Sequence, residues 1–177
     1  MSIRKKIMLT SFAGLIFLGI IMFFIASSSI KKMGEQEIHA LKTTLMEEKK
    51  QKLKNIVEMG VSQIEGVFAS KDQDEAGKKE LIFKLMKDMK YDDGTGYLWI
   101  NDMTPAMVFH PVNEGMNGKD LSDYKDQDGK RLFVEMVEVC KKEGEGTVGY
   151  KWAKPGFNEP VDKLSYVKLF KSLNWVI

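Results

Sequence analysis

The longest hydrophobic segment of the chain is an apolar run at residues 7–26, diluted only by two hydroxyl residues and two glycines. At about 1.5 Å of rise per residue, a helix of about 20 residues crosses the roughly 30 Å hydrocarbon core of a membrane. Three basic residues at positions 4–6 precede the run, and positively charged segments stay on the cytoplasmic side. The pattern predicts a cytoplasmic N-terminus at residues 1–6 and a transmembrane helix at residues 7–29, after which the chain is exported.

A cleaved signal peptide is the alternative interpretation of this segment. Residues 26–28, Ala-Ser-Ser, offer a small-residue processing site. The apolar cores of signal peptides usually run for only about 7–15 residues, however, and the run here is longer. Lys31 and Lys32 follow the span and reduce the charge difference across it. We favour an uncleaved anchor, which makes the chain a single-pass protein of the inner (plasma) membrane with its larger part extracytoplasmic.

Beyond the span, apolar residues recur at steps of three and four, and no proline interrupts them. This periodicity predicts one long helix from residue 30 to about residue 70. Its first half has a narrow apolar stripe, which suits pairing of two such helices in a homodimer as well as packing on the chain's own domain. A second helix is predicted at about residues 75–90. The stripe of the long helix consists of Ile38, Leu41, Leu45, Leu53, Ile56, Ile64 and Val67.

The rest of the chain, residues 71–177, has the pattern of one globular domain that begins with this second helix and continues as a sheet. Residues 92–96, Asp-Asp-Gly-Thr-Gly, end the helical period. Two hairpins follow from their turn residues and β-rich flanks. The predicted fold class is therefore α+β, with five antiparallel strands and helices on one side. Strands are expected at residues 97–101, 107–110, 146–153 and 161–170 and from residue 175, with a loop at residues 111–129 and a helix at residues 130–143.

Charge and cysteine content narrow the functional classes. The 177 residues carry a net charge of +2, with 29% charged residues. A nucleic-acid-binding protein would concentrate basic residues on one face, whereas the longest basic cluster here, residues 47–54, alternates with acidic and apolar residues. Cys140 is the single cysteine, so no disulfide forms within the chain. Its place on the apolar side of a predicted helix indicates a buried, inert thiol.

Catalytic motifs are absent from the sequence. His39 and His110 are the two histidines, and no GxSxG, HExxH, Walker or CxxC pattern occurs. A nucleophile, a base and an orienting group cannot be assembled from the residue spacing. We therefore expect no enzymatic activity and no cofactor.

An Asp-rich turn at residues 126–129 can be compared with a calcium-binding loop. Aligned on an EF-hand loop, Asp126, Asp128, Gly129 and Glu135 would fill positions three, five, six and twelve. Position one would then be Tyr124, which has no carboxylate. An Asp/Gly turn that caps the following helix explains the same residues, so no metal is expected.

Polar and aromatic residues gather on the predicted strands in a pattern that suits an anion. A carboxylate buried in a protein needs charge-assisted hydrogen-bond donors, because an unpaired buried anion is very costly. Alternation places Tyr97 and Trp99 on one face of their strand, and Tyr150 and Trp152 on one face of theirs. Aromatic residues on strands also commonly fill a core, and that interpretation stays open. The candidate ligand-binding residues are His110, Lys163, Tyr97, Tyr150 and Tyr166 as donors, Arg131 at the entrance, and Trp99 and Trp152 as walls.

Six short runs carry a resemblance to a known family. They read GYLWIND (96–102), MVFHP (107–111), DQDGK (126–130), GYKWAKPG (149–156), KLSYVKLF (163–170) and NWVI (174–177). In order and spacing they resemble the single Cache domain, of the type called sCache type 2, of bacterial methyl-accepting chemotaxis receptors and sensor kinases. The resemblance covers roughly residues 31–177.

The resemblance implies a PAS-like sheet with flanking helices, a pocket built from the central strands and the loop before them, and no required metal. It also implies that the ligands are short organic acids such as acetate, propionate, pyruvate and lactate. Family members usually continue past a run like that at residues 174–177 with the end of the fifth strand, a second membrane span and cytoplasmic signalling modules. The C-terminal strand is therefore expected to be truncated, because the chain is either a fragment of a receptor or a product without an output module.

Together these observations predict the extracytoplasmic sensory domain of a transmembrane receptor at residues 71–177, carried on a dimerisation helix at residues 30–70. Ligand closure of the sheet would shift that helix against its partner. The alternative is a membrane-anchored structural or dimerisation module in which aromatic residues fill the pocket. A surface lipoprotein or adhesin is disfavoured, because no lipobox cysteine lies near the span.

The two strongest candidate donors also predict a dependence on pH. If His110 and Lys163 share an anionic ligand, protonated His110 should bind that ligand better than neutral His110 does. A free imidazole has a pKa near about 6.5, and a bound carboxylate would raise it. Affinity should then improve as the pH falls from about 8 towards about 6.

Overall fold

The structure is a computed structural model that describes residues 2–177, with every side chain among them except that of residue 9. The chain divides into two compact units, Met1–Glu47 and Glu48–Ile177. Helix α1 (Ile3–Ala69) begins in the first unit and ends in the second. The long helix expected from the apolar periodicity is therefore confirmed as one uninterrupted element.

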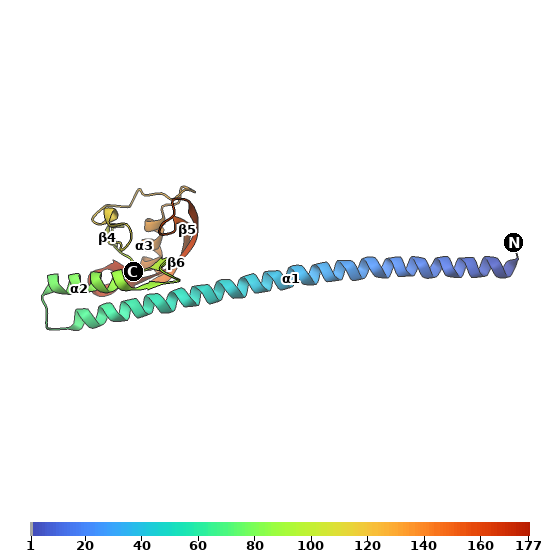
Figure 1. Ribbon diagram of the computed structural model, residues 1–177, viewed down its shortest axis with the longest axis horizontal. Coiled ribbons are helices and arrows are strands. Elements are labelled where there is room, and N and C mark those ends of the chain that lie inside the picture. Colours follow the sequence, from blue (N-terminus) through green and yellow to red (C-terminus); the bar gives the residue numbers. More distant parts are fainter. Residues whose placement is uncertain (1) are drawn as a thin grey trace. The chain divides into compact units, whose positions relative to one another are not determined.

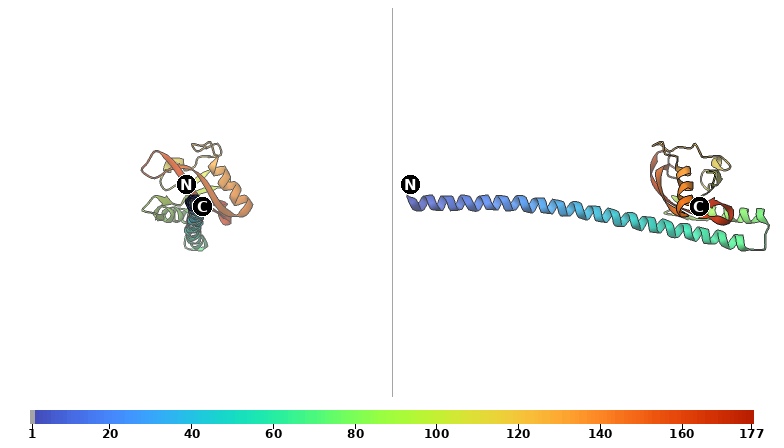
Figure 2. Two further views of the ribbon diagram at one scale, coloured as in Figure 1. Left: turned by 90° about the vertical axis from the view of Figure 1, so that its right-hand side faces the viewer. Right: turned by 180° about the vertical axis from the view of Figure 1, so that it is seen from behind.

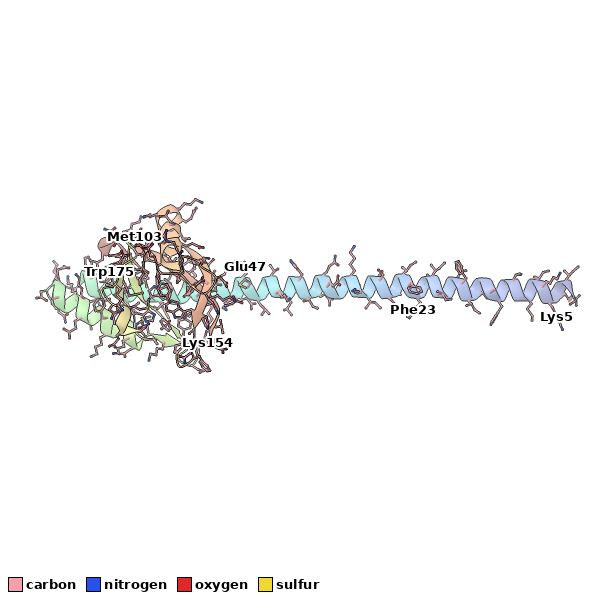
Figure 3. The ribbon with its side chains drawn as sticks, turned by 90° about the horizontal axis from the view of Figure 1, so that it is seen from above. Lys5, Phe23, Glu47, Met103, Lys154 and Trp175 are labelled. Carbon is pink, nitrogen blue, oxygen red and sulfur yellow. The ribbon has the colours of Figure 1, made fainter. Side chains whose placement is uncertain are left out.

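The first unit is the part of α1 up to Glu47. Its side chains project outward along the helix, as that of Phe23 does in Figure 3, and none of the described side chains of this unit is buried. Within α1, an 18-residue window reaches a mean hydropathy of 2.4. Among residues 2–177 this is the one helix whose length and composition suffice to cross a membrane, a test that a signal sequence near an N-terminus passes as well.

The second unit is built on a five-stranded antiparallel sheet, which confirms the predicted α+β fold. The strand order is β4-β3-β7-β6-β5, so the strand that comes last in the chain lies in the middle of the sheet. The longest hairpin pairs β5 with β6 without interruption, from Glu145 opposite Lys168 to Ala153 opposite Pro160. The strands are β3 (Ile100–Asp102), β4 (Met107–Phe109), β5 (Glu145–Ala153), β6 (Pro160–Phe170) and β7 (Trp175–Val176).

A separate two-stranded sheet, which the sequence pattern did not predict, precedes these strands. β1 (Lys90–Tyr91) pairs with β2 (Gly96–Tyr97) around a turn in which Asp92 and Asp93 both have positive φ. Positive φ at two successive turn residues is characteristic of a type I′ hairpin turn. The ring of Tyr91 lies over the backbone of β2, where a Cβ added to Gly96 would come within 2.2 Å of it. The strand expected at residues 97–101 is therefore divided between β2 and β3.

Helices cover both faces of the five-stranded sheet, so the expectation of helices on one side is wrong. α3 (Leu132–Glu143) lies on one face, and α2 (Glu75–Asp88) lies with residues 48–69 of α1 on the other (Figure 1, Figure 2). Alternation along β6 separates the two faces, since Val167 belongs to the core under α3 and Tyr166 to the core under α1 and α2. Apolar and aromatic side chains point to both faces of the sheet, so a helical layer on each face buries them away from water.

The later part of α1 packs on the sheet through residues spaced three and four apart. Its buried members are Leu53, Val57, Val61 and Ile64. The helix approaches the sheet so closely that a Cβ added to Gly60 would lie 2.5 Å from Leu98 Cδ1. In the earlier half of the predicted stripe, Ile38, Leu41 and Leu45 are each more than half exposed.

The shorter helices begin and end at residues suited to those positions. α2 starts after Asp74, whose side chain accepts a hydrogen bond from the Gly77 amide at 2.8 Å. α3 ends at Gly144, which has a φ of 80° and closes the last turn. Cys140 is buried on the inner side of α3, and burial raises the pKa of its thiol to about 11. Two 3₁₀ turns complete the unit, η1 (Glu114–Met116) and η2 (Lys171–Leu173).

Candidate ligand site

The structure brings together the aromatic residues that the sequence pattern selected. Tyr97 lies on β2, His110 directly follows β4, and Tyr150 and Trp152 lie on β5. The ring centroids of Tyr97 and His110 are 5.1 Å apart, and those of His110 and Trp152 are 6.2 Å apart. Trp99 belongs to the same buried cluster, on the sheet face that α3 covers. The period-two alternation predicted this shared face correctly.

A small inner cavity lies within this cluster. It is lined by the five aromatic side chains together with Leu132 and Phe133 of α3, and its volume is about 10 Å³. A space of that size holds about one water molecule. A carboxylic acid therefore enters the cavity only if the side chains around it move apart.

An open vestibule of about 510 Å³ adjoins the inner cavity. Residues of the loop at 112–127 and of the turn at 153–160, between β5 and β6, form its walls. Tyr97, His110 and Trp152 line both the vestibule and the cavity. We call these three residues the aromatic junction, because a ligand that passes from one space to the other has to pass them.

Lys163 brings a positive charge close to the aromatic junction. It lies on β6 directly opposite Tyr150, and its Nζ is 4.2 Å from the centre of the Tyr97 ring. The residue lines a separate cleft of about 190 Å³ between α1, the β1–β2 hairpin and β6, and it is not among the residues that line the inner cavity. Burial lowers the pKa of Lys163 to about 8. Within residues 2–177, no carboxylate lies within 4.0 Å of this ammonium group.

His110 is buried and uncharged near neutral pH. Its Nδ1 accepts hydrogen bonds from the backbone amides of Val112, at 3.2 Å, and Asn113, at 2.8 Å. These bonds place the ring proton on Nε2, which can donate to a ligand. Burial lowers the pKa of His110 to about 4, and the positive charge of Lys163 lowers it further. This low pKa argues against the expectation that protonated His110 improves binding between pH 8 and 6, because the free domain holds the imidazole neutral over that range.

The two tyrosines of this cluster, Tyr97 and Tyr150, are neutral hydroxyl donors. Burial raises the pKa of Tyr97 to about 12 and raises that of Tyr150 as well. The hydroxyl of Tyr150 lies 2.8 Å from Ser165 Oγ, a buried residue that sequence reasoning missed. Ser165 has the same strand parity as Lys163, so alternation alone could have pointed to it. Trp99 donates its indole N–H to Asn101 at 3.1 Å and is left to act as a wall.

Two predicted ligand residues lie away from this group. Tyr166 is three positions from Lys163 on β6, so alternation turns it to the opposite face of the sheet, where Lys54 Nζ lies 5.7 Å from its ring centre. Arg131 is exposed, and its Nε donates to the backbone carbonyl of Ser122 at 2.7 Å. The structure therefore brings neither side chain to the aromatic junction.

The Asp-rich turn has a structural role. Asp126 Oδ1 accepts the backbone N–H groups of Asp128 and Lys130, and Oδ2 accepts that of Lys151 on β5 at 2.9 Å. No cluster of metal ligands occurs among the residues that the structure describes. The turn ties the loop to β5 instead of capping α3, because the residue before α3, Arg131, makes no capping bond with its side chain.

Known proteins that are similar to this chain in sequence and fold include bacterial receptors. A family model described as a Cache domain, dCache_2, matches residues 27–177. The methyl-accepting chemotaxis protein McpP of Pseudomonas putida strain KT2440 is 31% identical over 183 residues. That alignment covers 100% of this chain and 31% of McpP, so the chain spans about a third of the length of this relative.

Two solved structures share both the fold and a good part of the sequence. One, described as the periplasmic sensor domain of a chemotaxis protein, is 34% identical with a TM-score of 0.68, covering 74% of this chain and 92% of that one. The other is described by the words "Structural basis for carboxylic acid recognition by a Cache chemosensory domain". It is 36% identical with a TM-score of 0.66, covering 71% of this chain and 87% of that one.

Proposed function

Because the chain belongs to the Cache domain family, we propose that its second unit is the extracytoplasmic sensory domain of a transmembrane receptor and binds a small organic carboxylate. Cache domains are non-catalytic ligand-binding modules, which agrees with the lack of catalytic motifs in the sequence. One neighbour of this structure is a Cache domain that recognises carboxylic acids, and another is a periplasmic sensor domain. Their likeness to this chain supports the proposal.

The observation that carries the proposal is the unpaired ammonium group of Lys163. Burial disfavours its charged form, and among residues 2–177 it has an aromatic ring as neighbour but no carboxylate. A buried charge is costly unless it is paired, so a protein retains such a group where an anion comes to pair with it. A ligand carboxylate would supply the missing charge and restore the ordinary preference for the protonated amine.

Three neutral donors near the aromatic junction complete the proposed site. The hydroxyls of Tyr97 and Tyr150 and the Nε2–H of His110 can each donate one hydrogen bond to a carboxylate. The Lys163 side chain would swing from the Tyr97 ring towards the ligand, and the junction would open to admit it. Acetate, propionate, pyruvate and lactate are the proposed ligands, since the site offers a few donors and little enclosed volume.

The rest of the chain fits the organisation of a membrane receptor. Residues 1–6 are the proposed cytoplasmic N-terminus, residues 7–29 the span in the inner membrane, and residues 30–70 the helix that pairs in a homodimer. Residues 71–177 are the proposed ligand-sensing domain, and chemotaxis signalling is the proposed output of the full receptor. A ligand changes such a receptor only through different affinities for its two states.

One observation favours a second function, a membrane-anchored structural or dimerisation module without a ligand. The inner cavity of about 10 Å³ is nearly filled by its own aromatic lining. In that case the partly buried Lys163 would be stabilised by the Tyr97 ring alone, since a cation over an aromatic ring gains about 0.5–2 kcal/mol. A binding experiment separates the two functions.

The test is a thermal-denaturation screen of the full chain in detergent micelles against the four acids, followed by calorimetry. A ligand at 100 times its Kd stabilises the folded state by about 2.7 kcal/mol. Lys163→Met should weaken binding about 10- to 150-fold, because a hydrogen bond to a charged group contributes about 1.5–3 kcal/mol. Lys79→Met, at an exposed lysine of α2 that lines neither the vestibule nor the cavity, should bind as the wild type does. Binding that survives Lys163→Met would place the acid elsewhere, and no binding at all would favour the structural module.

A further inference from the structure

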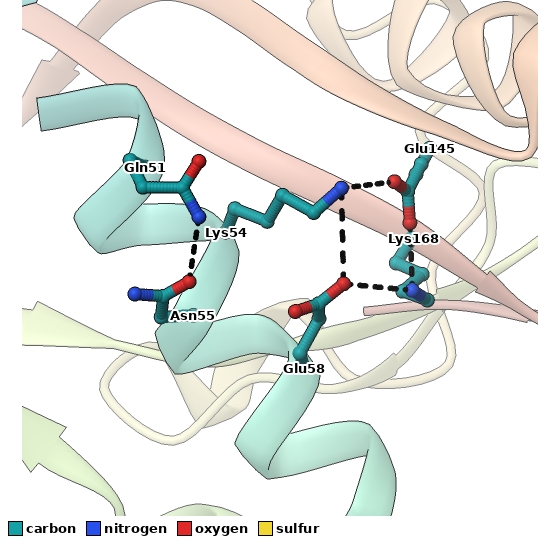
Figure 4. Close-up of polar contacts among 6 residues, drawn as sticks. All are labelled: Gln51, Lys54, Asn55, Glu58, Glu145 and Lys168. Carbon is teal, nitrogen blue, oxygen red and sulfur yellow. Dashed lines mark hydrogen bonds and ion pairs between the residues drawn. The ribbon is translucent and has the colours of Figure 1, made fainter. Parts of the chain in front are cut away.

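Four charged side chains of alternating sign form a ring where α1 meets the β5–β6 hairpin (Figure 4). Glu145 Oε1 accepts from Lys54 Nζ at 2.6 Å, and Glu145 Oε2 lies 2.6 Å from Lys168 Nζ. Glu58 Oε1 completes the ring at 3.3 Å from Lys168 Nζ and 3.8 Å from Lys54 Nζ. We call these four residues the charge ring. Two of its members come from α1 and two from the sheet.

The charge ring is partly shielded from solvent and stays charged over a wide pH range. The side chains of Glu145 and Lys168 are each 29% exposed. Hydrogen bonds from Lys168 and Lys54 lower the pKa of Glu145 to about 2. Tyr166 lies beside the ring, with Lys54 over its face, which gives this residue a place in the structure away from the aromatic junction.

A continuous hairpin connects the charge ring to the aromatic junction. Glu145 and Lys168 face each other at one end of the β5–β6 pairing, and Tyr150 and Lys163 face each other five rows further along. At about 3.3 Å per residue the two pairs are about 17 Å apart. No bulge interrupts the rows between them, so a tilt of the hairpin at the junction also moves Glu145 and Lys168.

The order of charges on α1 allows one position of the helix along the hairpin. Lys54 and Glu58 are four residues apart and therefore lie on one side of the helix. Sliding α1 by one turn, about 5.4 Å, would bring Glu58 opposite Glu145, or Lys54 opposite Lys168 in the other direction. Either step places one pair of like charges opposite each other, although the second also brings Lys50 opposite Glu145.

We propose that the charge ring is a register lock, which holds α1 in one position along the β5–β6 hairpin and transmits ligand binding at the aromatic junction to α1. The lock itself follows from the ring geometry, and the transmission rests on the proposed carboxylate binding. Opening the junction for a ligand would move β5 and β6, and the paired charges would draw residues 54 and 58 of α1 with them.

The test measures the position of α1 against the rest of the second unit in the full chain in detergent micelles. Spin labels are attached at Ser62→Cys on α1 and Lys142→Cys on α3, both exposed positions, and the sample is diluted with unlabelled chain. The native Cys140 is buried, so it does not take the label. Distance distributions are recorded with and without pyruvate for the wild type and for Glu145→Gln.

A matched variant keeps the ring but inverts every charge: Lys54→Glu, Glu58→Lys, Glu145→Lys and Lys168→Glu together. We expect one narrow distance in the wild type, a broader or displaced distribution in Glu145→Gln, and a narrow one again in the inverted ring. Pyruvate should shift the distance in the wild type and the inverted ring. In Glu145→Gln that shift should fall by at least half, while the Kd for pyruvate changes by less than threefold.

Two results would overturn the proposal. An identical ligand-free distribution in Glu145→Gln and wild type would show that the ring does not fix the register of α1. An undiminished pyruvate-induced shift in Glu145→Gln would show that the signal reaches α1 by another route. If the wild type binds none of the four acids, the proposed function fails, and the ligand-free comparison still decides whether the lock exists.

Discussion

Removing the charge of Lys163 should make the free domain more stable while it removes ligand binding. Replacement by Met keeps most of the unbranched stem and deletes the ammonium group. The pKa of Lys163 falls from 10.5 to about 8 because folding buries the amine. At about 1.36 kcal/mol per pKa unit, this lowering corresponds to a cost of about 3 kcal/mol for the protonated form in the folded state.

Two opposing contributions reduce the expected gain. The cation over the Tyr97 ring, at 4.2 Å, is lost in the variant, at a cost of about 1 kcal/mol. The amine also keeps part of its hydration, since the residue is only partly buried. We therefore expect Lys163→Met to raise the free energy of unfolding by about 1–2 kcal/mol at pH 7.

The gain should disappear at high pH, and the sign follows from the two pKa values. Lys163 is easier to deprotonate in the folded state, so between about pH 8 and 10.5 the unfolded chain holds the extra proton. The stability of the wild type therefore rises with pH across that window, and the burial cost is present in full below pH 8. The difference between variant and wild type should shrink from pH 7 to pH 10.

Urea denaturation followed by tryptophan fluorescence measures this difference, because all three tryptophans lie in the second unit. Lys154→Met, at an exposed lysine, is the control and should change stability by less than about 0.5 kcal/mol. A Lys163→Met variant less stable than the wild type at pH 7 would refute the reasoning. So would a gain that stays the same at pH 10.

Three further predictions test the site, the helix packing and the dimer. The affinity for lactate, measured by calorimetry, should be nearly constant between pH 6 and 7.5. Above pH 8 it should fall up to about tenfold per pH unit, because Lys163 loses its proton. A marked improvement from pH 7 to 6 would contradict this prediction. Gly60→Ala should destabilise the domain by about 1–3 kcal/mol through overpacking. Gly66→Ala, where an added Cβ meets nothing within 4 Å, should stabilise it by about 0.5–1 kcal/mol; similar effects in urea denaturation would contradict the packing. Leu41→Glu with Leu45→Glu should weaken self-association in sedimentation, since each leucine would contribute about 1.5–3 kcal/mol when the proposed dimer buries it. An unchanged dimer would exclude this face.

The sequence predicted the parts of the fold that depend on local periodicity. Alternation placed Tyr97 and Trp99 on one face, and Tyr150 and Trp152 on one face, and all four lie in one cluster. The same rule, applied from Lys163, would have turned Tyr166 away from that cluster. Its selection was an error in using the pattern rather than a limit of the pattern.

Other features depend on contacts between distant segments and could not be predicted from the sequence. The low pKa of His110 follows from its burial and from the charge of Lys163, which lies 53 positions later in the chain. The presence of helical layers on both faces follows from the packing of the later part of α1 on the face opposite α3. The hairpin of β1 and β2 depends on the ring of Tyr91 packing over a glycine of β2, a contact that neither residue suggests alone.

The position of β7 has a consequence for how the domain assembles. The two residues of β7 lie between β3 and β6, in the middle of the sheet, yet they are the last of the five strands to be synthesised. Until they arrive, the β3–β4 and β5–β6 hairpins each expose an unpaired edge, a feature prone to aggregation. Joining them requires contacts across a large sequence separation, which slows folding. An emerging chain would therefore need protection of these edges until residues 175–176 have emerged.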